Sequence, residues 1–144
     1  MEVTQLVVFK LGTEEYGIPI EQVREIINCI PVTKLPGTPS YVAGVINVRG
    51  KIISVMDFAA KLGLVVNRVS KQIVIVEALS KEVGLTVDEV TEVIQTAQEN
   101  FAVLDSVVGG GRGVKNVYKL GEKIIILLDL EHILLGEKTI LSPE

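Results

Sequence analysis

The chain has 144 residues, enough for one domain with an ordinary hydrophobic core but short for an enzyme with separate cofactor and substrate domains. Hydrophobic residues make up 48% of it and charged residues 22%, which excludes the composition of a disordered chain. The formal net charge of -4 disfavours a nucleic-acid surface, because such a surface needs clustered Lys and Arg to neutralise phosphates. We therefore expect a single folded domain over residues 1–144 whose partners do not include nucleic acid.

The cysteine content and the N-terminus bear on location. The single cysteine, Cys29, cannot form an internal disulfide, and the first residues lack the basic and then apolar pattern of a leader. No apolar run approaches the ~18 residues of a membrane span. We expect a cytoplasmic protein that reaches a membrane only through a partner. Because Cys29 lies beside Asn28 and Ile30 and not among basic residues, it is predicted to be a small packed residue without thiol chemistry.

The apolar pattern predicts a mostly-β fold. Valine and isoleucine dominate, aromatic residues are only 4%, and β-branched side chains fit a pleated sheet better than a helix. Helical spacing is found at residues 20–27, where Ile20, Val23 and Ile27 share one face, and in two short pieces that each follow an Asp. In chain order, the predicted strands are residues 5–11, 51–57, 71–76, 82–87, 114–120 and 123–128.

The two pieces that follow an Asp belong to a repeat. Residues 51–57 and 123–129 share the pattern Lys-Ile-Ile-x-x-x-Asp at an offset of 72 residues, half the chain. A strand that ends in Asp, whose carboxylate accepts the first free N–H groups of a short helix, is a self-contained unit. We interpret the pair as two similar β-subdomains that share a hydrophobic seam, with a chance match in an Ile-rich chain as the alternative.

Candidate catalytic residues are few. His132 is the only histidine and Cys29 the only cysteine, so the usual zinc or iron ligand sets are missing, and no Gly-x-Ser-x-Gly motif presents a serine. The carboxylate pairs Glu14-Glu15 and Asp88-Glu89 are predicted to be solvated, because adjacent residues on a strand point to opposite faces. His132 is interpreted as an ordinary helical side chain. We therefore expect no enzymatic activity, no metal and no cofactor.

One glycine-rich run, Gly109 to Gly113, invites comparison with phosphate-binding loops. It lacks the Lys-Ser/Thr ending of such a loop and precedes a strand-like segment where a helix should start. A hairpin or crossover loop is the favoured interpretation, and a small anion- or ligand-binding domain remains the alternative from a different functional class.

A segment of small apolar residues, 42–48, ends in Arg49-Gly50, a bulky cation at a predicted turn. Gly44 and Gly50 allow another backbone to approach closely. The Arg49 guanidinium offers a planar fork for carboxylates or backbone carbonyls. Two interpretations fit these residues equally well. Either they form a buried strand followed by a turn that happens to contain an arginine, or they have a role in binding a partner.

An ordered set of motifs resembles the CheW-like family. It runs from about Gln5 to about Leu135, and Asn-Val-Arg-Gly at residues 47–50 is its most specific member. The resemblance implies two small SH3-like five-stranded β-barrel subdomains packed together, with a few short helices. The motifs are Phe9-x-Leu11-Gly12-x-x-x-Tyr16-Gly17-Ile18, Val23-x-Glu25-Ile26, Pro36-x-x-Pro39-x-x-Val42-x-Gly44-Val45-Ile46-Asn47-Val48-Arg49-Gly50, Ile53-x-Val55-x-Asp57, Val83-Gly84-Leu85-x-Val87-Asp88-x-Val90 and Ile125-Ile126-Leu127-Leu128-Asp129.

The resemblance also implies a function without turnover. Free-standing members of the family bridge the cytoplasmic tips of chemoreceptors and the regulatory domain of the histidine kinase CheA, so we expect a chemotaxis adaptor recruited to membrane-associated receptor arrays and monomeric when free. A CheW-like scaffold of a non-motility chemosensory pathway is the alternative. By position, the receptor-binding groove is expected to include Val23, Glu25, Gly44, Arg49 and Val93, and the kinase contact Ile73, Val74, Ile75 and Val76, through apolar pairing of like barrels.

Overall fold

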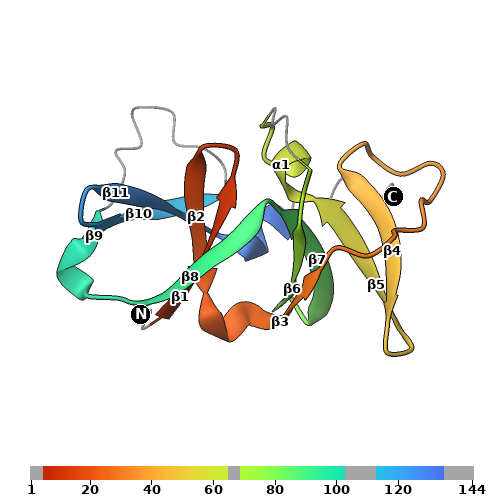
Figure 1. The fold of residues 1–144 in the computed structure, drawn as a ribbon, viewed down its shortest axis with the longest axis horizontal. Coiled ribbons are helices and arrows are strands. Elements are labelled where there is room, and N and C mark those ends of the chain that lie inside the picture. The colour runs from red at the N-terminus through yellow and green to blue at the C-terminus, as the bar shows by residue number, and fades with distance from the viewer. Residues whose placement is uncertain (1–4, 65–68, 103–112, 135–144) are drawn as a thin grey trace.

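Two twisted β-sheets lie side by side as two lobes (Figure 1). The computed structural model describes residues 5–64, 69–102 and 113–134. Sheet A has the strand order β8-β1-β2-β11-β10-β9, and sheet B has the order β3-β6-β7-β5-β4. The predicted mostly-β fold of two small subdomains with a few short helices is confirmed. Sheet A differs from the expected five strands only by β9 (Phe101–Ala102), a two-residue strand.

The strands of sheet B follow one another along the chain, whereas sheet A combines strands from both ends of it. Sheet B contains β3 (Val23–Asn28), β4 (Val42–Val48), β5 (Lys51–Asp57), β6 (Gln72–Ala78) and β7 (Lys81–Val87). Sheet A contains β1 (Gln5–Leu11), β2 (Glu14–Pro19), β8 (Glu89–Gln95), β10 (Val114–Leu120) and β11 (Lys123–Leu128) beside β9. The short helices are η1 (Ile20–Gln22), α1 (Phe58–Lys61), η2 (Gln98–Asn100) and the helical residues 130–134.

Residues 20–27 do not form the predicted helix. The segment is the short turn η1 followed by β3, along which half-buried and exposed residues alternate. β3 pairs antiparallel with β6, with Ile26 opposite Val74 and Ile27 opposite Ile73. The helix prediction was wrong because three apolar residues at helical spacing also fit a strand, and the β-branched side chains together with the ladder to β6 favour the strand.

The two sheets repeat one topology. In each sheet an antiparallel hairpin, β1–β2 in sheet A or β6–β7 in sheet B, pairs through its second strand, in parallel, with the second strand of another hairpin, β10–β11 in sheet A or β4–β5 in sheet B. The β-bulges also coincide. In each bulge one residue has no partner on the adjacent strand. This residue is Thr91 on β8 and Arg24 on the corresponding strand β3, and Lys115 on β10 and Ala43 on the corresponding strand β4. The sequence repeat therefore extends from one strand of each half to almost the whole fold.

The repeat does not place one half of the chain in each sheet. β1 and β2 begin the chain but lie in sheet A beside β8 to β11, whereas β3 to β5 lie in sheet B with β6 and β7. The chain crosses from sheet A to sheet B after β2 and returns at Asp88, between β7 and β8. Each half thus gives its first two strands to one sheet and its later strands to the other.

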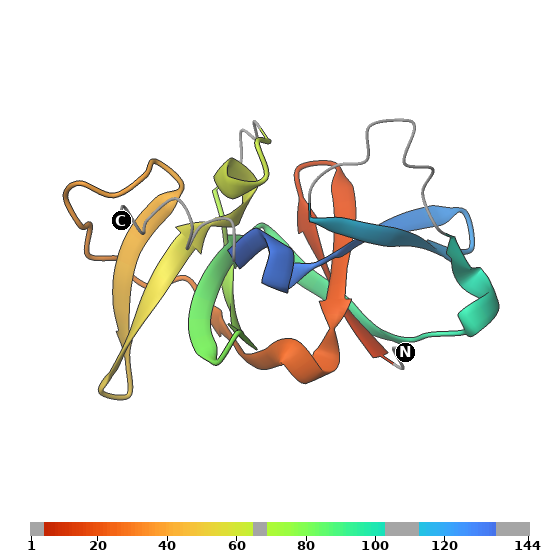
Figure 2. The same ribbon diagram turned by 180° about the vertical axis from the view of Figure 1, so that it is seen from behind.

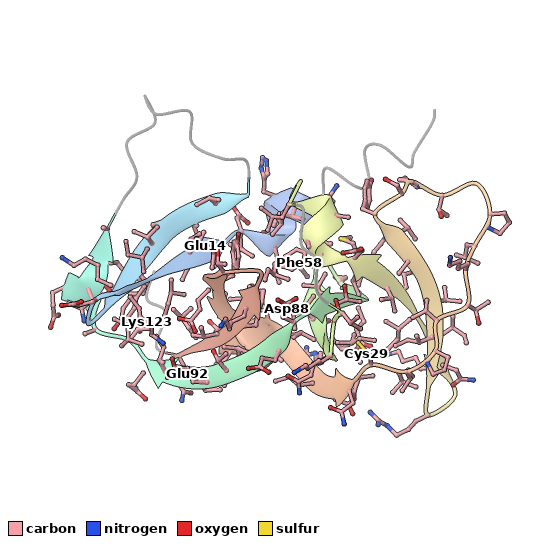
Figure 3. The ribbon with its side chains drawn as sticks, turned by 45° about the horizontal axis from the view of Figure 1, so that its top comes forward. Glu14, Cys29, Phe58, Asp88, Glu92 and Lys123 are labelled. Atoms are coloured by element: carbon pink, nitrogen blue, oxygen red, sulfur yellow. The ribbon has the colours of Figure 1, made fainter. Side chains whose placement is uncertain are left out.

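In the part of the chain that the structure describes, the buried side chains form three clusters. The largest draws residues from both sheets, including Phe9 of β1 and Phe58 of α1, whose ring centroids lie 6.0 Å apart. Figure 3 shows Phe58 near the middle of the molecule. Figure 2 shows the helical residues 130–134 between the two lobes, where Leu130 and Ile133 join this shared cluster. Each sheet also has a smaller core of its own, with Val8 and Ile125 in sheet A and Ile53 and Ile75 in sheet B. The shared cluster holds the two sheets together.

Both Asp-capped units are present as predicted. Asp57 Oδ1 accepts a hydrogen bond from the Ala60 N–H at 3.2 Å, and Asp129 Oδ1 accepts one from the His132 N–H at 3.2 Å. Each carboxylate therefore satisfies a free donor in the first turn of the helix that follows its strand. The His132 side chain is exposed on its helix.

Candidate functional site

Arg49 lies at the tip of the β4–β5 hairpin, in a two-residue turn with Gly50. Their φ angles of 51° and 85° are the left-handed values of a type I′ turn, whose twist suits the flanking strands. Asn47 Oδ1 accepts a hydrogen bond from the Gly50 N–H at 2.8 Å, which fixes the turn further. The Asn-Val-Arg-Gly motif thus builds a rigid turn that holds the Arg49 side chain at one end of sheet B.

Arg49 forms an ion pair with Glu25. Its Nη2 donates a hydrogen bond to Glu25 Oε1, which joins the β4–β5 turn to β3. This hydrogen bond holds the pKa of the Glu25 carboxyl below its ordinary value and raises the pKa of Arg49. The Arg49 side chain is 72% exposed, so most of its donors face solvent. The structure therefore brings two of the expected receptor-facing residues into direct contact.

The ion pair lies on the rim of a shallow depression at this end of sheet B. Buried Ile53 and Ile75 belong to its lining, as does half-buried Val48. The charged residues around it include Lys51, whose Nζ lies 2.9 Å from Glu82 Oε1. The depression therefore has a rim of paired charges over an apolar floor that is almost fully buried.

Gly44 supports this surface from within. It is buried at the β4 bulge with a φ of 145°, beside a stretch in which Thr33 and Val45 exchange two backbone hydrogen bonds of 2.9 Å. A Cβ at position 44 would lie 2.0 Å from the Thr33 carbonyl oxygen. Glycine is required here by the close approach of a second backbone.

The two valines of the predicted groove lie on different sheets. Val23 is half-buried at the start of β3, opposite Val76, and packs against the shared cluster. Val93 lies on β8 of sheet A, opposite Val7, and is 49% exposed. When β8 of sheet A is aligned with β3 of sheet B by their bulges, Val93 corresponds to Ile26. Ile26 is also exposed. The groove prediction therefore combines an exposed ion pair on sheet B with an exposed valine on sheet A.

The four residues expected at the kinase contact lie inside the molecule. They are consecutive in β6, between β3 and β7, and none is more than 2% exposed. Ile73 and Ile75 pack in the core of sheet B, and Val74 and Val76 in the shared cluster. A partner that docks on sheet B would touch other side chains of that sheet.

A second ion cluster was missed from the sequence. Lys123 Nζ lies 3.1 Å from Glu15 Oε1 and 3.2 Å from Glu92 Oε2, and these contacts raise the pKa of Lys123. Figure 3 shows Lys123 and Glu92 together at one end of sheet A. The sequence repeat does show that Lys51 and Lys123 hold matching positions. It does not show their carboxylate partners, because these lie far away along the chain. The prediction of a solvated Glu15 was wrong, since its side chain is 14% exposed and ion-paired.

Two further sequence predictions need correction. Asp88, expected to be solvated, is 6% exposed, and its Oδ2 accepts a hydrogen bond from the Gly12 N–H at 2.9 Å. This bond fixes the crossover between β7 and β8 to the β1–β2 turn. Cys29, expected to be packed, is exposed at the end of β3, where partial desolvation raises the pKa of its thiol. The burial of Asp88 depends on how the chain passes between the sheets, whereas Cys29 lies just after the last residue of β3.

Within residues 5–64, 69–102 and 113–134, no group of three or more His, Cys, Asp or Glu side chains is arranged to hold a metal ion. The helices in that same part of the chain are all too short or too polar to cross a membrane. Residues 109–112 of the glycine-rich run lie outside the described residues, so the interpretation of that loop stays a prediction.

The topology and the surface together define a class: small domains of two similar β-sheets that share one core and present a charged, partly apolar end. Comparison with known proteins gives this class a family. The model of the CheW-like domain matches residues 5–138, and the chain belongs to the CheW-like family.

Relatives cover nearly the whole chain. "Chemotaxis protein CheW" of Rhizobium meliloti (strain 1021) is 29% identical over 93% of this chain and 89% of its own length. The protein of the same name from Klebsiella aerogenes is 31% identical over 93% of this chain and 83% of its own. The crystal structure of the scaffolding protein TtCheW from Thermoanaerobacter tengcongensis superposes with a TM-score of 0.83 at 35% identity, covering 92% of this chain and 88% of that one.

Proposed function

We propose that this protein is a non-catalytic adaptor of chemotaxis signalling that couples chemoreceptors to the histidine kinase CheA, acting at receptor arrays on the cytoplasmic side of the membrane. The observation that carries the proposal is the exposed Glu25–Arg49 ion pair, held by a rigid turn at residues expected to face a receptor. Membership of the CheW-like family, and relatives described as chemotaxis and scaffolding proteins, support it.

The receptor contact is assigned to side chains that have free surface. Val93 and the neighbourhood of Val23 would bury apolar area against a receptor helix. Arg49 keeps donors to spare after binding Glu25, because a guanidinium has five N–H groups, and these suit receptor carboxylates or helix-end carbonyls. Gly44 acts through the backbone by allowing the β4 segment to pack against Thr33.

The kinase contact is assigned to the outer surface of sheet B. Residues Ile73 to Val76 would shape that surface from inside, since their side chains are buried. Ile52 on β5 of the same sheet is 63% exposed and supplies the kind of apolar side chain that pairing of like domains requires.

Co-sedimentation tests the proposal directly. The receptor signalling fragment and the kinase of the same organism are mixed with and without this protein, and both the pelleted fractions and the kinase activity are measured. We expect a ternary complex whose kinase activity depends on the protein. Kinase activity and receptor co-assembly that were indifferent to its presence would refute the adaptor role.

Charge reversal at Arg49 tests the receptor-facing surface. We expect Arg49→Glu to weaken receptor binding by about tenfold or more while the fold is retained, because the side chain is exposed and its new charge repels Glu25. Lys119→Glu is the control for the reversal of one surface charge, since Lys119 is exposed on β10 of sheet A, away from the depression. Binding is measured by calorimetry and folding by circular dichroism. Loss of the folded state in Arg49→Glu alone would show that its role is structural.

A further inference from the structure

Lys123 joins two strands of sheet A that are not neighbours. Its partner Glu15 lies on β2, directly beside β11, where Ile125 is paired with Glu15. Its other partner, Glu92, lies on β8, and the strands β1 and β2 separate β8 from β11 in the sheet. One ammonium group therefore spans the end of sheet A.

The cluster lies over the core of sheet A. Glu92 is opposite Val8 and Glu15 is level with Ile125, and paired residues on adjacent strands share a face of the sheet. Both Val8 and Ile125 are fully buried in that core. Lys123 lies two residues before Ile125 on the same strand and so points to the same side. The contact is thus made across the inner side of the curved sheet.

β8 is the strand that depends most on this contact. Among the described residues its only ladder partner is β1, and the ladder shifts register at Thr91. An edge strand with a bulge has fewer hydrogen bonds to set its direction. Thr91 Oγ1 donates to the Val8 carbonyl at 3.2 Å, and the Lys123–Glu92 pair follows one residue later. Val93, 49% exposed, comes immediately after this pair.

Sheet B performs the matching task with two cations. Lys51 binds Glu82, the counterpart of Glu15, while Arg49 binds Glu25, the counterpart of Glu92. In sheet A the place of Arg49 in the hairpin turn is taken by Gly121. Lys123 alone therefore serves both carboxylates, and its loss would release β8 from β11.

We propose that Lys123 is a positioning residue for the receptor-facing surface: by binding Glu92 it sets the direction of β8 and with it the orientation of Val93. The inference rests on the proposed function, because the receptor contact of Val93 is part of that function. It adds a residue of β11, a strand that β1 and β2 separate from β8 in the sheet.

The test compares the affinity of four chains for the receptor signalling fragment: wild type, Lys123→Met, Lys123→Arg and Lys119→Met. Lys119 is exposed on the neighbouring β10, so Lys119→Met is the control for loss of one positive charge. We expect Lys123→Met to weaken binding by about two- to fivefold, the range of a partly exposed ion pair, and Lys119→Met to change it by less than about twofold. Lys123→Arg should restore wild-type affinity to within about twofold, since the guanidinium can bind both carboxylates.

Two readouts separate positioning from general stability. At about 1 M salt, where the Debye length falls to about 3 Å, the affinities of wild type and Lys123→Met should converge. In the free protein, amide hydrogen exchange along β8 should be faster in Lys123→Met, and in Glu92→Gln, than in Lys119→Met.

The outcomes distinguish this inference from the proposed function. Wild-type protein that binds the receptor fragment, with Lys123→Met binding equally well, would overturn the inference alone. Failure of Lys123→Arg to restore affinity, or unchanged exchange in β8, would also overturn it. A wild-type chain that does not bind the fragment refutes the proposed function and this inference with it.

Discussion

The two subdomains have the same strand order but close their ends differently. In sheet B each carboxylate has its own cation, Arg49 for Glu25 and Lys51 for Glu82, whereas in sheet A Lys123 serves both Glu15 and Glu92. The difference comes from a turn, because a hairpin that carries Arg49 in sheet B carries a glycine in sheet A. The repeated fold thus keeps the carboxylates in place, while the turn residue decides which subdomain presents an exposed guanidinium.

The largest expected difference between the two subdomains is at the bulges of β4 and β10. Gly44 and Asn116 hold matching places, but Thr33 packs against the backbone of Gly44. We expect Gly44→Ala to lower the free energy of unfolding by about 3 kcal/mol or more, because the new Cβ meets the Thr33 carbonyl and the φ is left-handed. Urea denaturation measures the change.

Gly50→Ala is the control for this prediction. Gly50 has a φ of 85°, but a Cβ added there would meet nothing within 4 Å, so only backbone strain remains, worth about 1 kcal/mol. Equal losses in the two variants would show that the Thr33 segment moves aside at little cost.

The next largest difference in stability is expected at the two crossovers between the sheets. Asp88 in the second crossover and Glu21 in the first hold matching positions, but Asp88 is buried and bound to Gly12 whereas Glu21 is exposed. Asp88→Ala should cost about 1–3 kcal/mol, because the Gly12 N–H loses its acceptor, and Glu21→Ala less than about 0.5 kcal/mol. Thermal unfolding of both variants, with Asp88→Asn retaining an acceptor, measures the difference. A neutral Asp88→Ala would mean that water replaces the carboxylate.

The Asp-capped helices should sharpen the comparison by behaving alike. Asp57 and Asp129 each accept a hydrogen bond of 3.2 Å in the first turn. We expect Asp57→Ala and Asp129→Ala each to lower stability by about 1 kcal/mol, and the corresponding Asn variants to lose much less. Chemical denaturation curves test both. A difference of more than about 1 kcal/mol between the two Ala variants would contradict the equivalence of the units.

The smallest expected effect is a contrast in pH dependence. The pKa of Glu25 is lowered from 4.5 by Arg49, so this pair contributes above about pH 4.5 and is lost as the pH falls through the folded-state pKa. The pKa of Lys123 is raised from 10.5 by Glu15 and Glu92, so that cluster contributes below about pH 10.5 and is lost as the pH rises through its folded-state value.

NMR titration of the two side chains checks both directions. Arg49→Met should return the Glu25 midpoint toward 4.5, whereas Lys119→Met should leave it in place. A Glu25 midpoint that does not respond to Arg49→Met would show that the ion pair does not form in solution.

The sequence predicted features that depend on local pattern. Strands 5–11, 114–120 and 123–128 have the predicted bounds, and both Asp caps were found, because strand alternation and capping involve residues close in the chain. The turn at Arg49 was also visible, since a glycine follows a bulky residue there.

Features that depend on strand order were not predictable in this way. The burial of Asp88 comes from Gly12, which is 76 residues away in the chain, and the Lys123–Glu92 contact joins strands that are not neighbours even in the sheet. Residues 20–27 were predicted as a helix from the spacing of their apolar side chains alone. That spacing carries no information about β6, the strand with which residues 23–28 pair.

The exchange of strands between the halves has a consequence for how the chain is made. All five strands of sheet B are present once residue 87 has left the ribosome, whereas the hairpin of β1 and β2 waits for β11 near the other end of the chain. Pairing between distant segments is slow, and contiguous segments associate first. We therefore expect sheet B to assemble during translation, with the earliest-synthesised hairpin held beside it until the last strand arrives and completes sheet A.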